Sequence, residues 1–260
     1  MDDVIREGDL IGVEAVTGQR RRIYYFRARR DYIYHTIAGV LRGDDIVGSQ
    51  WGSSFKSSIG YMYIFKPTII EIMNNFYKRV TQVIYPKDLG YMALLSGIRR
   101  GMRVIEAGAG SGFLTTIILH HICPGGLLYS LDVRRDNLDI VLENLKLANV
   151  DTSCLKLVHG DVRSHNLPSG MDAAFLDMPD PWNALDNLYK SLRPSGTLIV
   201  FLPTYNQVEK LIRHAEESGW IIYYSGELME REIEPQPEAI RPSVRMIGFT
   251  GFIVALRKML

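Results

Sequence analysis

The sequence predicts a doubly wound α/β fold with a mostly parallel sheet, preceded by a small all-β domain. Short β-type runs separated by Gly, Asp and Ser turns fill the chain up to about residue 66, and beyond Pro67 strand and helix patterns alternate. Such alternation is typical of parallel strands joined by crossover helices. We therefore predict two domains, residues 1–66 and residues 67–260.

The N-terminal domain is predicted from runs of β-forming residues. These runs are Leu10 to Val16, Arg22 to Phe26, Tyr32 to Ile37 and Tyr61 to Phe65. After Pro67 the apolar residues recur at helical spacing, so a helix is expected there and the domain boundary is placed near Lys66.

The second domain is predicted as a series of strands separated by helices. Its strands are expected at Arg103 to Ala107, Leu127 to Asp132, Leu155 to Val158, Ala173 to Asp177, Thr197 to Leu202, Ile221 to Tyr224 and Met246 to Leu256. Its helices are expected at Gly112 to Ile122, Arg135 to Ala148, Trp182 to Ser191 and Asn206 to Ser218. In such sheets ligands bind beyond the carboxyl ends of the strands, so the residues that end the strands are the functional candidates.

The composition is that of a globular protein, with 47% hydrophobic and 23% charged residues among 260. No apolar stretch approaches the roughly 18 residues that suggest a membrane span, and the acidic N-terminus lacks the pattern of a secretory signal. Cys123 and Cys154 are too few for a disulfide framework and lack metal-site spacing. We therefore expect two buried thiols and a reducing cytoplasm as the compartment.

The net charge of +1 gives no sign of a nucleic-acid partner, but the arginines are unevenly placed. Six of them lie within residues 20–30, where there is no acidic residue: Arg20, Arg21, Arg22, Arg27, Arg29 and Arg30. Such a cluster is a candidate footprint for phosphates. The alternative is a solvated strand face whose charges have scattered partners.

A glycine-rich turn joins the first strand of the second domain to a helix. Gly108, Gly110 and Gly112 let the backbone turn tightly, and the start of the helix offers unpaired N–H groups to a ligand. Phe113 occupies the third glycine position of a dinucleotide fingerprint, which argues against NAD or FAD. The turn instead resembles the ExGxGxG motif of class I methyltransferases, with Glu106 as its acidic residue.

Three carboxylates end or follow the next parallel strands. Asp132 ends the second strand, where a carboxylate can accept hydrogen bonds from both hydroxyls of a ribose. Asp161 follows the third strand, and the methyltransferase pattern implies that it accepts from an adenine amino group. Asp177 ends the fourth strand, in a loop stiffened by Pro179 and Pro181.

Three segments of the chain match one known family. They are the run QVIYPKD at residues 82–88, the turn from Glu106 to Gly112, and the loop from Asp177 to Trp182. Together they closely resemble the tRNA (adenine-58-N1) methyltransferases, which are Rossmann-like class I enzymes. The similarity extends over the whole chain, including His35 to Gly48 and Arg241–Pro242, and QVIYPKD is its most discriminating element.

The resemblance implies that S-adenosylmethionine is the cofactor, that tRNA is the partner and that the assembly is a homotetramer. The chemistry expected of a carboxylate at this site requires no metal. The cofactor contacts that the resemblance implies fall on Ser111, Gly112, Phe113, Leu114, Asp132, Asn137, Asp161 and Asp177. The glycine turn itself adds Gly108 and Gly110 to the expected cofactor site. The same match makes Asp177 the catalytic carboxylate. Two positions depart from the family pattern. Phe249 stands where relatives often have His, so a role for that histidine does not carry over, and Asp132 stands where Glu is common.

The expected reaction is methylation of N1 of an adenine. Asp177 would accept a hydrogen bond from the exocyclic amine, orient N1 and stabilise the positive charge that develops there. A base folded into tRNA must also be extruded, and Tyr85, Trp182, Tyr205 or Tyr91 would supply the stacking surface. The sequence leaves open which of them does so, and whether adenosine 57 is modified as well as adenosine 58.

Two other functions share part of this pattern. A class I methyltransferase acting on a protein or a small molecule would use the same cofactor site, but it does not explain the arginines or QVIYPKD. A non-catalytic tRNA-binding partner subunit would keep the fold. The glycine turn together with Asp132, Asp161 and Asp177 argues against that second alternative.

Overall fold

The computed structural model describes residues 3–235 and 239–260, and the chain divides into two compact units, residues 1–77 and 78–260. The division lies at Tyr77, beyond the predicted boundary at Lys66, because helix α2 (Ile69–Phe76) belongs to the N-terminal unit. The Tyr25 hydroxyl donates a 2.6 Å hydrogen bond to the Glu71 carboxylate of α2, and the Tyr25 ring packs edge-on against Phe76. The helix that was expected to begin the second domain therefore belongs to the first unit.

The N-terminal unit is built on an antiparallel sheet with the strand order β2-β1-β6-β5. Its elements are β1 Leu10–Thr17, β2 Arg20–Arg27, β3 Ile33–Thr36, β4 Gly39–Arg42, α1 Gly43–Ile46, β5 Ser54–Lys56 and β6 Tyr61–Phe65. The run predicted over residues 32–37 is one strand of a hairpin whose second strand is β4. Neither β4 nor β5 was predicted, because three or four residues show too little alternation to be recognised.

The second unit is a seven-stranded sheet with the strand order β12-β15-β11-β10-β7-β8-β9. Its strands are β7 Arg103–Ala107, β8 Leu127–Asp132, β9 Leu155–His159, β10 Met171–Leu176, β11 Leu192–Leu202, β12 Trp220–Glu227 and β15 Phe252–Lys258. Its helices are α3 Pro86–Ser96, α4 Phe113–Ile122, α5 Arg135–Leu147, the 3-10 helix η1 Pro181–Ala184, α6 Leu185–Ser191 and α7 Tyr205–Glu217. Strand β15 runs antiparallel to both of its neighbours, and the other pairs are parallel. The predicted doubly wound, mostly parallel sheet is thus confirmed.

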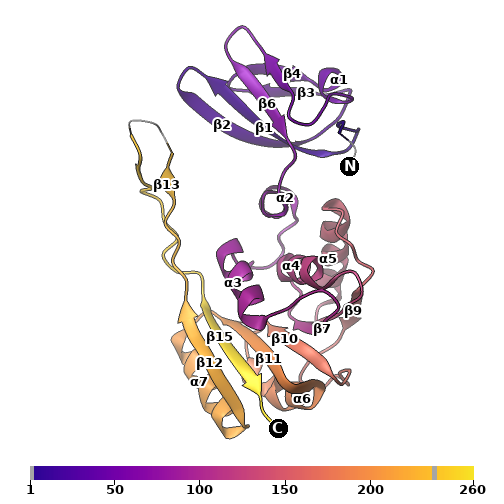
Figure 1. Cartoon of the computed structure of the whole chain (residues 1–260), viewed down its shortest axis with the longest axis vertical. Coiled ribbons are helices and arrows are strands. Elements are labelled where there is room, and N and C mark those ends of the chain that lie inside the picture. Colours follow the sequence, from indigo (N-terminus) through magenta and orange to yellow (C-terminus); the bar gives the residue numbers. More distant parts are fainter. Residues whose placement is uncertain (1–2, 236–238) are drawn as a thin grey trace. The chain divides into compact units, whose positions relative to one another are not determined.

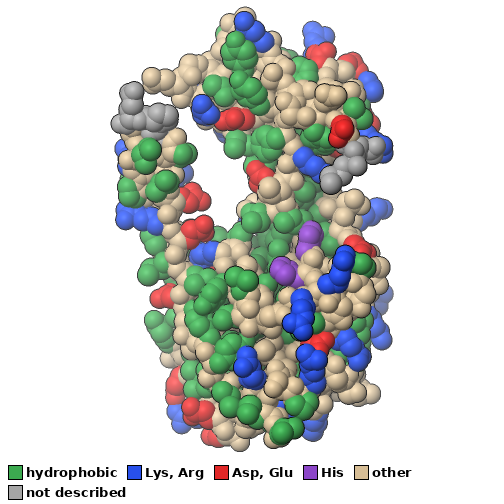
Figure 2. Space-filling model, viewed as in Figure 1, with side chains coloured by type: hydrophobic (Ala, Val, Ile, Leu, Met, Phe, Trp, Pro, Cys, Tyr) green, Lys and Arg blue, Asp and Glu red, His purple; other side chains and the backbone are tan. Residues whose placement is uncertain are grey.

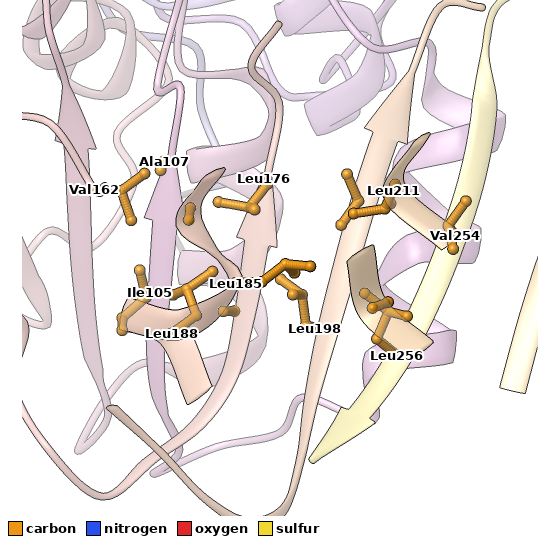
Figure 3. Close-up of a cluster of buried hydrophobic side chains, with 14 of the residues drawn as sticks. Ile105, Ala107, Val162, Leu176, Leu185, Leu188, Leu198, Leu211, Val254 and Leu256 are labelled. Carbon is orange, nitrogen blue, oxygen red and sulfur yellow. The ribbon is translucent and has the colours of Figure 1, made fainter. Parts of the chain in front are cut away.

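Helices cover both faces of this sheet, with α3, α4 and α5 on one side and α6 and α7 on the other (Figure 1). Figure 3 shows the second interface, where Ile105, Leu176 and Leu198 of three neighbouring strands lie among Leu185 of α6 and Leu211 of α7. All five side chains are essentially buried. Because both faces are covered, the strands are apolar along most of their length, and polar residues are concentrated at their ends.

The strand order reverses between β7 and β10. From β7 the chain continues to β8 and β9 in one direction, then returns to β10 and β11 on the other side of β7. Loops leaving the carboxyl ends of β7 and β10 therefore diverge, and the crevice between them is where a doubly wound sheet binds its ligand. Gly108 follows β7 and Asp177 follows β10.

Between β12 and β15 the chain forms a long two-stranded arm that extends beyond the sheet (Figure 1). Its paired segments are β13 Ile233–Glu234 and β14 Arg241–Pro242. The strand predicted from Met246 begins only at Phe252, because the preceding residues belong to this arm. No helix in residues 3–235 and 239–260 combines the length and the apolar character needed to cross a membrane.

Cys123 and Cys154 form a disulfide, so the prediction of two free thiols is wrong. Cys123 ends α4 and Cys154 directly precedes β9, and their Cα atoms are 5.9 Å apart. The two residues are 31 positions apart in the sequence, so spacing gave no sign of the pairing. The expectation of a reducing compartment rested on unpaired cysteines, so the disulfide removes its support.

Candidate active site

The glycine turn links the end of β7 to the start of α4 and has a backbone that only glycine adopts readily. Gly108, Gly110 and Gly112 have φ angles of 90°, 55° and 82°, all in the left-handed region. A Cβ on Gly108 would lie 2.0 Å from the backbone oxygen of Asp177, so the two loops meet without room for a side chain. The turn thus brings bare backbone and the first N–H groups of α4 to the sheet edge.

Glu106 supports the glycine turn from inside the core. Its carboxylate is fully buried and accepts hydrogen bonds from the hydroxyls of Thr115 (2.8 and 3.0 Å) and Ser130 (2.6 Å). Burial raises the pKa of Glu106 to about 7, against the opposing effect of these hydrogen bonds. The acidic residue of the ExGxGxG motif therefore ties β7 to α4 and β8 rather than lining the cavity.

Ser111, Phe113 and Leu114 are also buried. The Ser111 hydroxyl accepts a hydrogen bond from the backbone N–H of Val80 (3.1 Å), which anchors the segment leading into the QVIYPKD run. Together with Gly110 and Gly112, these three residues do not line the cavity described below, although the resemblance assigned cofactor contacts to them. They shape the turn that forms its wall.

Asp132 ends β8 with its carboxylate held in place by three donors. Oδ2 accepts from the N–H of Gly110 (3.0 Å) and from Nδ2 of Asn137 (2.9 Å), and Oδ1 accepts from the N–H of Arg134 (2.9 Å). Asn137 is buried and acts through Asp132, so its side chain orients that carboxylate. A carboxylate has about four acceptor sites, so Asp132 retains capacity for a ligand hydroxyl.

Asp161 lies after β9 and is bound by an arginine that sequence reasoning missed. Arg163 donates through Nε (2.8 and 2.9 Å) and Nη2 (2.5 Å) to the Asp161 carboxylate, and through Nη1 (2.6 Å) to Asp180. The hydrogen bonds from Arg163 lower the pKa of Asp161. Asp180 is the N-cap residue of the 3-10 helix that follows, but its side chain makes no capping hydrogen bond there. Asp161 follows β9 and Asp180 follows β10. Their carboxylates therefore meet at Arg163 only because the two loops fold together.

Asp177 follows β10 and faces the same cavity as Asp132 and Asp161. The cavity has a volume of about 390 Å³, and its wall is formed by Ala107, Gly108, Leu131, Asp132, Val133, Arg134, Gly160, Asp161, Val162, Arg163, Asp177, Met178, Pro179 and Asp180. Burial, with a smaller contribution from the charge of Asp132, raises the pKa of Asp177 to about 6. The structure therefore brings together the three strand-end carboxylates and Gly108 of the predicted cofactor site.

The four aromatic candidates lie in different surroundings. Trp182 is half-buried under α7, with Lys210 Nζ 4.3 Å from its ring centre. Tyr85 precedes α3 as its N-cap residue, and Tyr91 packs against Tyr224. Tyr205, the first residue of α7, is 72% exposed and packs on Phe252. Among these candidates Tyr205 has the most accessible ring.

The N-terminal arginines are exposed on β2 and in the turn that follows it. Arg21 pairs with Glu14 across the sheet, Arg29 pairs with Asp31, and Arg30 lies 4.0 Å from Asp44. Acidic partners outside residues 20–30 thus engage part of the cluster. In the described residues, the Arg20 side chain has neither an ion pair nor a hydrogen bond, and the Arg22 side chain lies over the Tyr24 ring.

Comparison with known proteins agrees with this geometry. Residues 60–244 match the model of a family described as the tRNA methyltransferase complex GCD14 subunit. The chain belongs to this family. It is 31% identical to the tRNA (adenine(57)-N(1)/adenine(58)-N(1))-methyltransferase TrmI of Methanocaldococcus jannaschii, over 86% of this chain and 87% of that protein. It is 28% identical to the tRNA (adenine(58)-N(1))-methyltransferase TrmI of Thermus thermophilus, over 92% and 94% of the two chains.

Solved structures give the same fold. The TrmI tRNA (m1A58) methyltransferase of Aquifex aeolicus superposes with a TM-score of 0.87 at 26% identity, covering 99% of both chains. A protein of Thermotoga maritima described as a SAM-dependent O-methyltransferase gives a TM-score of 0.90 at 25% identity, covering 99% of this chain and 96% of its own. The second unit therefore has the class I methyltransferase fold. The two proteins are named for different acceptor atoms, so the fold alone does not identify the substrate.

Proposed function

We propose that this protein transfers a methyl group from S-adenosylmethionine to N1 of an adenine in tRNA. The observation that carries the proposal is the half-buried carboxylate of Asp177, which lines the cavity at the switch point together with Asp132 and Asp161. Family membership supports the substrate, because the relatives from Methanocaldococcus and Thermus are named for N1 of adenine 58. We take adenosine 58 as the target.

The cavity fits S-adenosylmethionine. The left-handed turn at Gly108 offers bare backbone at one wall, and the oriented carboxylate of Asp132 suits the hydroxyls of a ribose. Asp161 also lines the cavity, and a contact from it to an adenine amine would compete with its ion pair to Arg163. When bound, the cofactor supplies an electrophilic methyl group on a sulfonium centre.

Asp177 would orient the base and balance its charge. Adenine N1 lies next to the exocyclic amine, so a carboxylate that accepts from the amine also fixes N1. As the bond from N1 to the methyl carbon forms and the bond from sulfur breaks, positive charge moves onto the base, and the Asp177 carboxylate stabilises it. Its partial burial strengthens this effect because less water screens the charge than at the surface.

Mapping the methylated nucleotide tests the proposal. The full chain is incubated with an unmodified tRNA transcript and labelled S-adenosylmethionine, and we expect label on N1 of adenosine 58; the same map reports on adenosine 57. Asp177→Ala should lower the single-turnover rate by about 100-fold or more with little change in tRNA affinity, since phosphate contacts supply most of that affinity. Asp186→Ala, which changes an exposed residue of α6, is the matched control.

Three results would contradict the proposal. A rate for Asp177→Ala within about threefold of wild type would remove Asp177 from this role. Methylation of a protein or a small molecule instead of tRNA would favour the first alternative function. A chain with no affinity for S-adenosylmethionine would be a non-catalytic partner subunit.

We also propose that the chain forms a homo-oligomer in the cytoplasm, where its tRNA substrate is found. The arm between β12 and β15 supports the first part, because it exposes Met229, Ile233, Ile240, Val244 and Ile247. Figure 2 shows hydrophobic side chains along this arm, mixed with charged ones. Exposed apolar surfaces of this kind mark sites of association. Sedimentation of the full chain should give a mass larger than one protomer, and a monomer would contradict the proposal.

A further inference from the structure

A second cavity lies at the same edge of the seven-stranded sheet, on the other side of Asp177. It has a volume of about 520 Å³ and is lined by Pro203, Thr204, Tyr205, Glu227, Gly248, Phe249 and Phe252. The first three of these residues follow β11, and Glu227 ends β12. The last three precede or begin β15, so the cavity lies over the strands beyond β10. The cavity described above lies toward β7, β8 and β9 instead. Asp177 therefore separates two cavities along one sheet edge.

Three aromatic rings form the apolar part of this second cavity. Phe252 is buried, with ring centres of Tyr205 and Phe249 at 4.4 and 4.9 Å from its own. Tyr205 is 72% exposed and Phe249 is 47% exposed. A buried ring thus supports two accessible ones, an arrangement that leaves flat apolar surface available to a ligand.

Phe249 is held in place by a buried polar cluster. The next residue, Thr250, donates a 2.7 Å hydrogen bond to the fully buried carboxylate of Asp88 and accepts one of 2.6 Å from Lys87 Nζ. Lys87 and Asp88 are also paired at 2.8 Å. Both belong to the QVIYPKD run, so this motif anchors the end of the arm that carries Phe249. Breaking such a buried pair is costly, which fixes the position of the ring.

Tyr205 is tied to the loop that carries Asp177. Gln207, in the first turn of α7, donates a 2.9 Å hydrogen bond to the backbone oxygen of Pro179. Neighbouring strands lie about 4.8 Å apart, so a cavity over β11 and β15 begins roughly 5–10 Å from the end of β10. The start of α7, which carries Tyr205, is therefore linked directly to the loop that carries Asp177.

The lining also indicates the charge of the ligand. All of its residues lie in the described part of the chain, and they include one carboxylate, Glu227, and no Lys or Arg. Such a site disfavours phosphate and suits a neutral aromatic ring that carries an N–H donor. We infer that this cavity, through Tyr205 and Phe249, receives the extruded adenine base and presents it to Asp177 from the side opposite the cofactor cavity. The inference rests on the proposed function and assigns the base-stacking residues that the sequence left open.

Replacing the rings tests this assignment. Tyr205→Leu and Phe249→Leu should each lower the single-turnover rate of tRNA methylation by about 10- to 100-fold, the range expected for loss of one base-stacking contact. Affinities for S-adenosylmethionine and for whole tRNA should stay within about twofold. Tyr205→Phe and Phe249→Tyr, which keep a ring, should restore most of the rate. Ile221→Ala, which changes an apolar residue about as exposed as Phe249 near the opposite end of β12, is the control.

A tRNA with 2-aminopurine at the target position gives a readout that a folding defect would not mimic. The extruded base should be quenched by stacking in the wild-type complex, and its fluorescence should rise severalfold in the leucine variants. Wild-type rates and unchanged fluorescence in the leucine variants would overturn the inference and leave the proposed function standing. A wild-type chain that does not methylate tRNA would overturn both.

Discussion

The backbone oxygen of Asp177 occupies the space beside Gly108, where a Cβ would lie only 2.0 Å from it. The glycine turn after β7 and the carboxylate loop after β10 are thereby packed backbone to backbone. This contact fixes the distance between the wall of the cofactor cavity and the proposed catalytic residue. It also explains why a side chain is excluded at this position of the turn.

Gly108→Ala should damage both functions of the site together. The φ of 90° costs a side chain about 1–2 kcal/mol, and the clash with Asp177 adds to it by shifting one of the loops. We expect at least a tenfold loss of S-adenosylmethionine affinity by calorimetry, with a parallel loss of methyl transfer. Gly125→Ala is the matched control, since its φ is 91° and no atom lies within 4 Å of the added Cβ. Equal effects of the two variants would show that backbone strain alone is responsible.

The raised pKa of Asp177 makes the reaction and the stability depend on pH in opposite directions. With a pKa of about 6, the carboxylate is ionised above pH 6, so the single-turnover rate should rise about tenfold per pH unit below 6 and then level off. The pKa is higher in the folded chain than its usual value of 3.8, so the ionised group destabilises the fold above pH 6, and this penalty is lost as the pH falls toward 4.

Asp177→Asn should therefore raise the free energy of unfolding at pH 8 by about 2–3 kcal/mol while abolishing most of the activity. Denaturation at pH 8 and at pH 4 measures the effect, which should nearly vanish at the lower pH. An Asn variant that is less stable than wild type at pH 8 would show that the carboxylate has a stabilising partner.

Local sequence patterns were sufficient to predict the parallel sheet and its strand-end carboxylates. Apolar strands followed by glycine or aspartate are a signal confined to a few residues, so Gly108, Asp132 and Asp177 were found at the correct strand ends. The bridge that Arg163 makes between Asp161 and Asp180 was not found, because Asp180 follows another strand. The aromatic cavity was missed for the same reason, since Tyr205 and Phe249 meet only through the antiparallel β15.

Features that depend on pairing over long distances could not be predicted. The Cys123–Cys154 disulfide joins residues 31 positions apart that have no motif of their own. The domain boundary also moved, because α2 packs on the N-terminal sheet through Tyr25, and its helical pattern alone did not show which unit it joins.

Opening the disulfide should lower stability without changing the chemistry. A closed loop of 31 residues corresponds to a loss of about 3–4 kcal/mol on removal in the chain-entropy treatment. For a unit of this size that is a fall in Tm of roughly 10 °C. Calorimetry of Cys154→Ser, and of the wild type with and without reductant, measures it. If reductant leaves the Tm of the wild type unchanged, the disulfide does not contribute to stability in solution.

The last prediction concerns the arginines of β2. We expect the triple variant Arg20→Ala, Arg21→Ala, Arg22→Ala to bind tRNA more weakly while keeping its affinity for S-adenosylmethionine. All three side chains are exposed, and only Arg21 has an acidic partner in the described residues. Each phosphate contact contributes about 0.7–0.9 to the slope of log affinity against log salt, so three contacts would reduce that slope by about 2–3. Arg213→Ala, which changes an arginine already paired with Glu209 on α7, should leave the slope unchanged. A triple variant with wild-type affinity and slope would place the tRNA contacts on another surface. That result would leave the proposed methyltransferase function of the second unit standing.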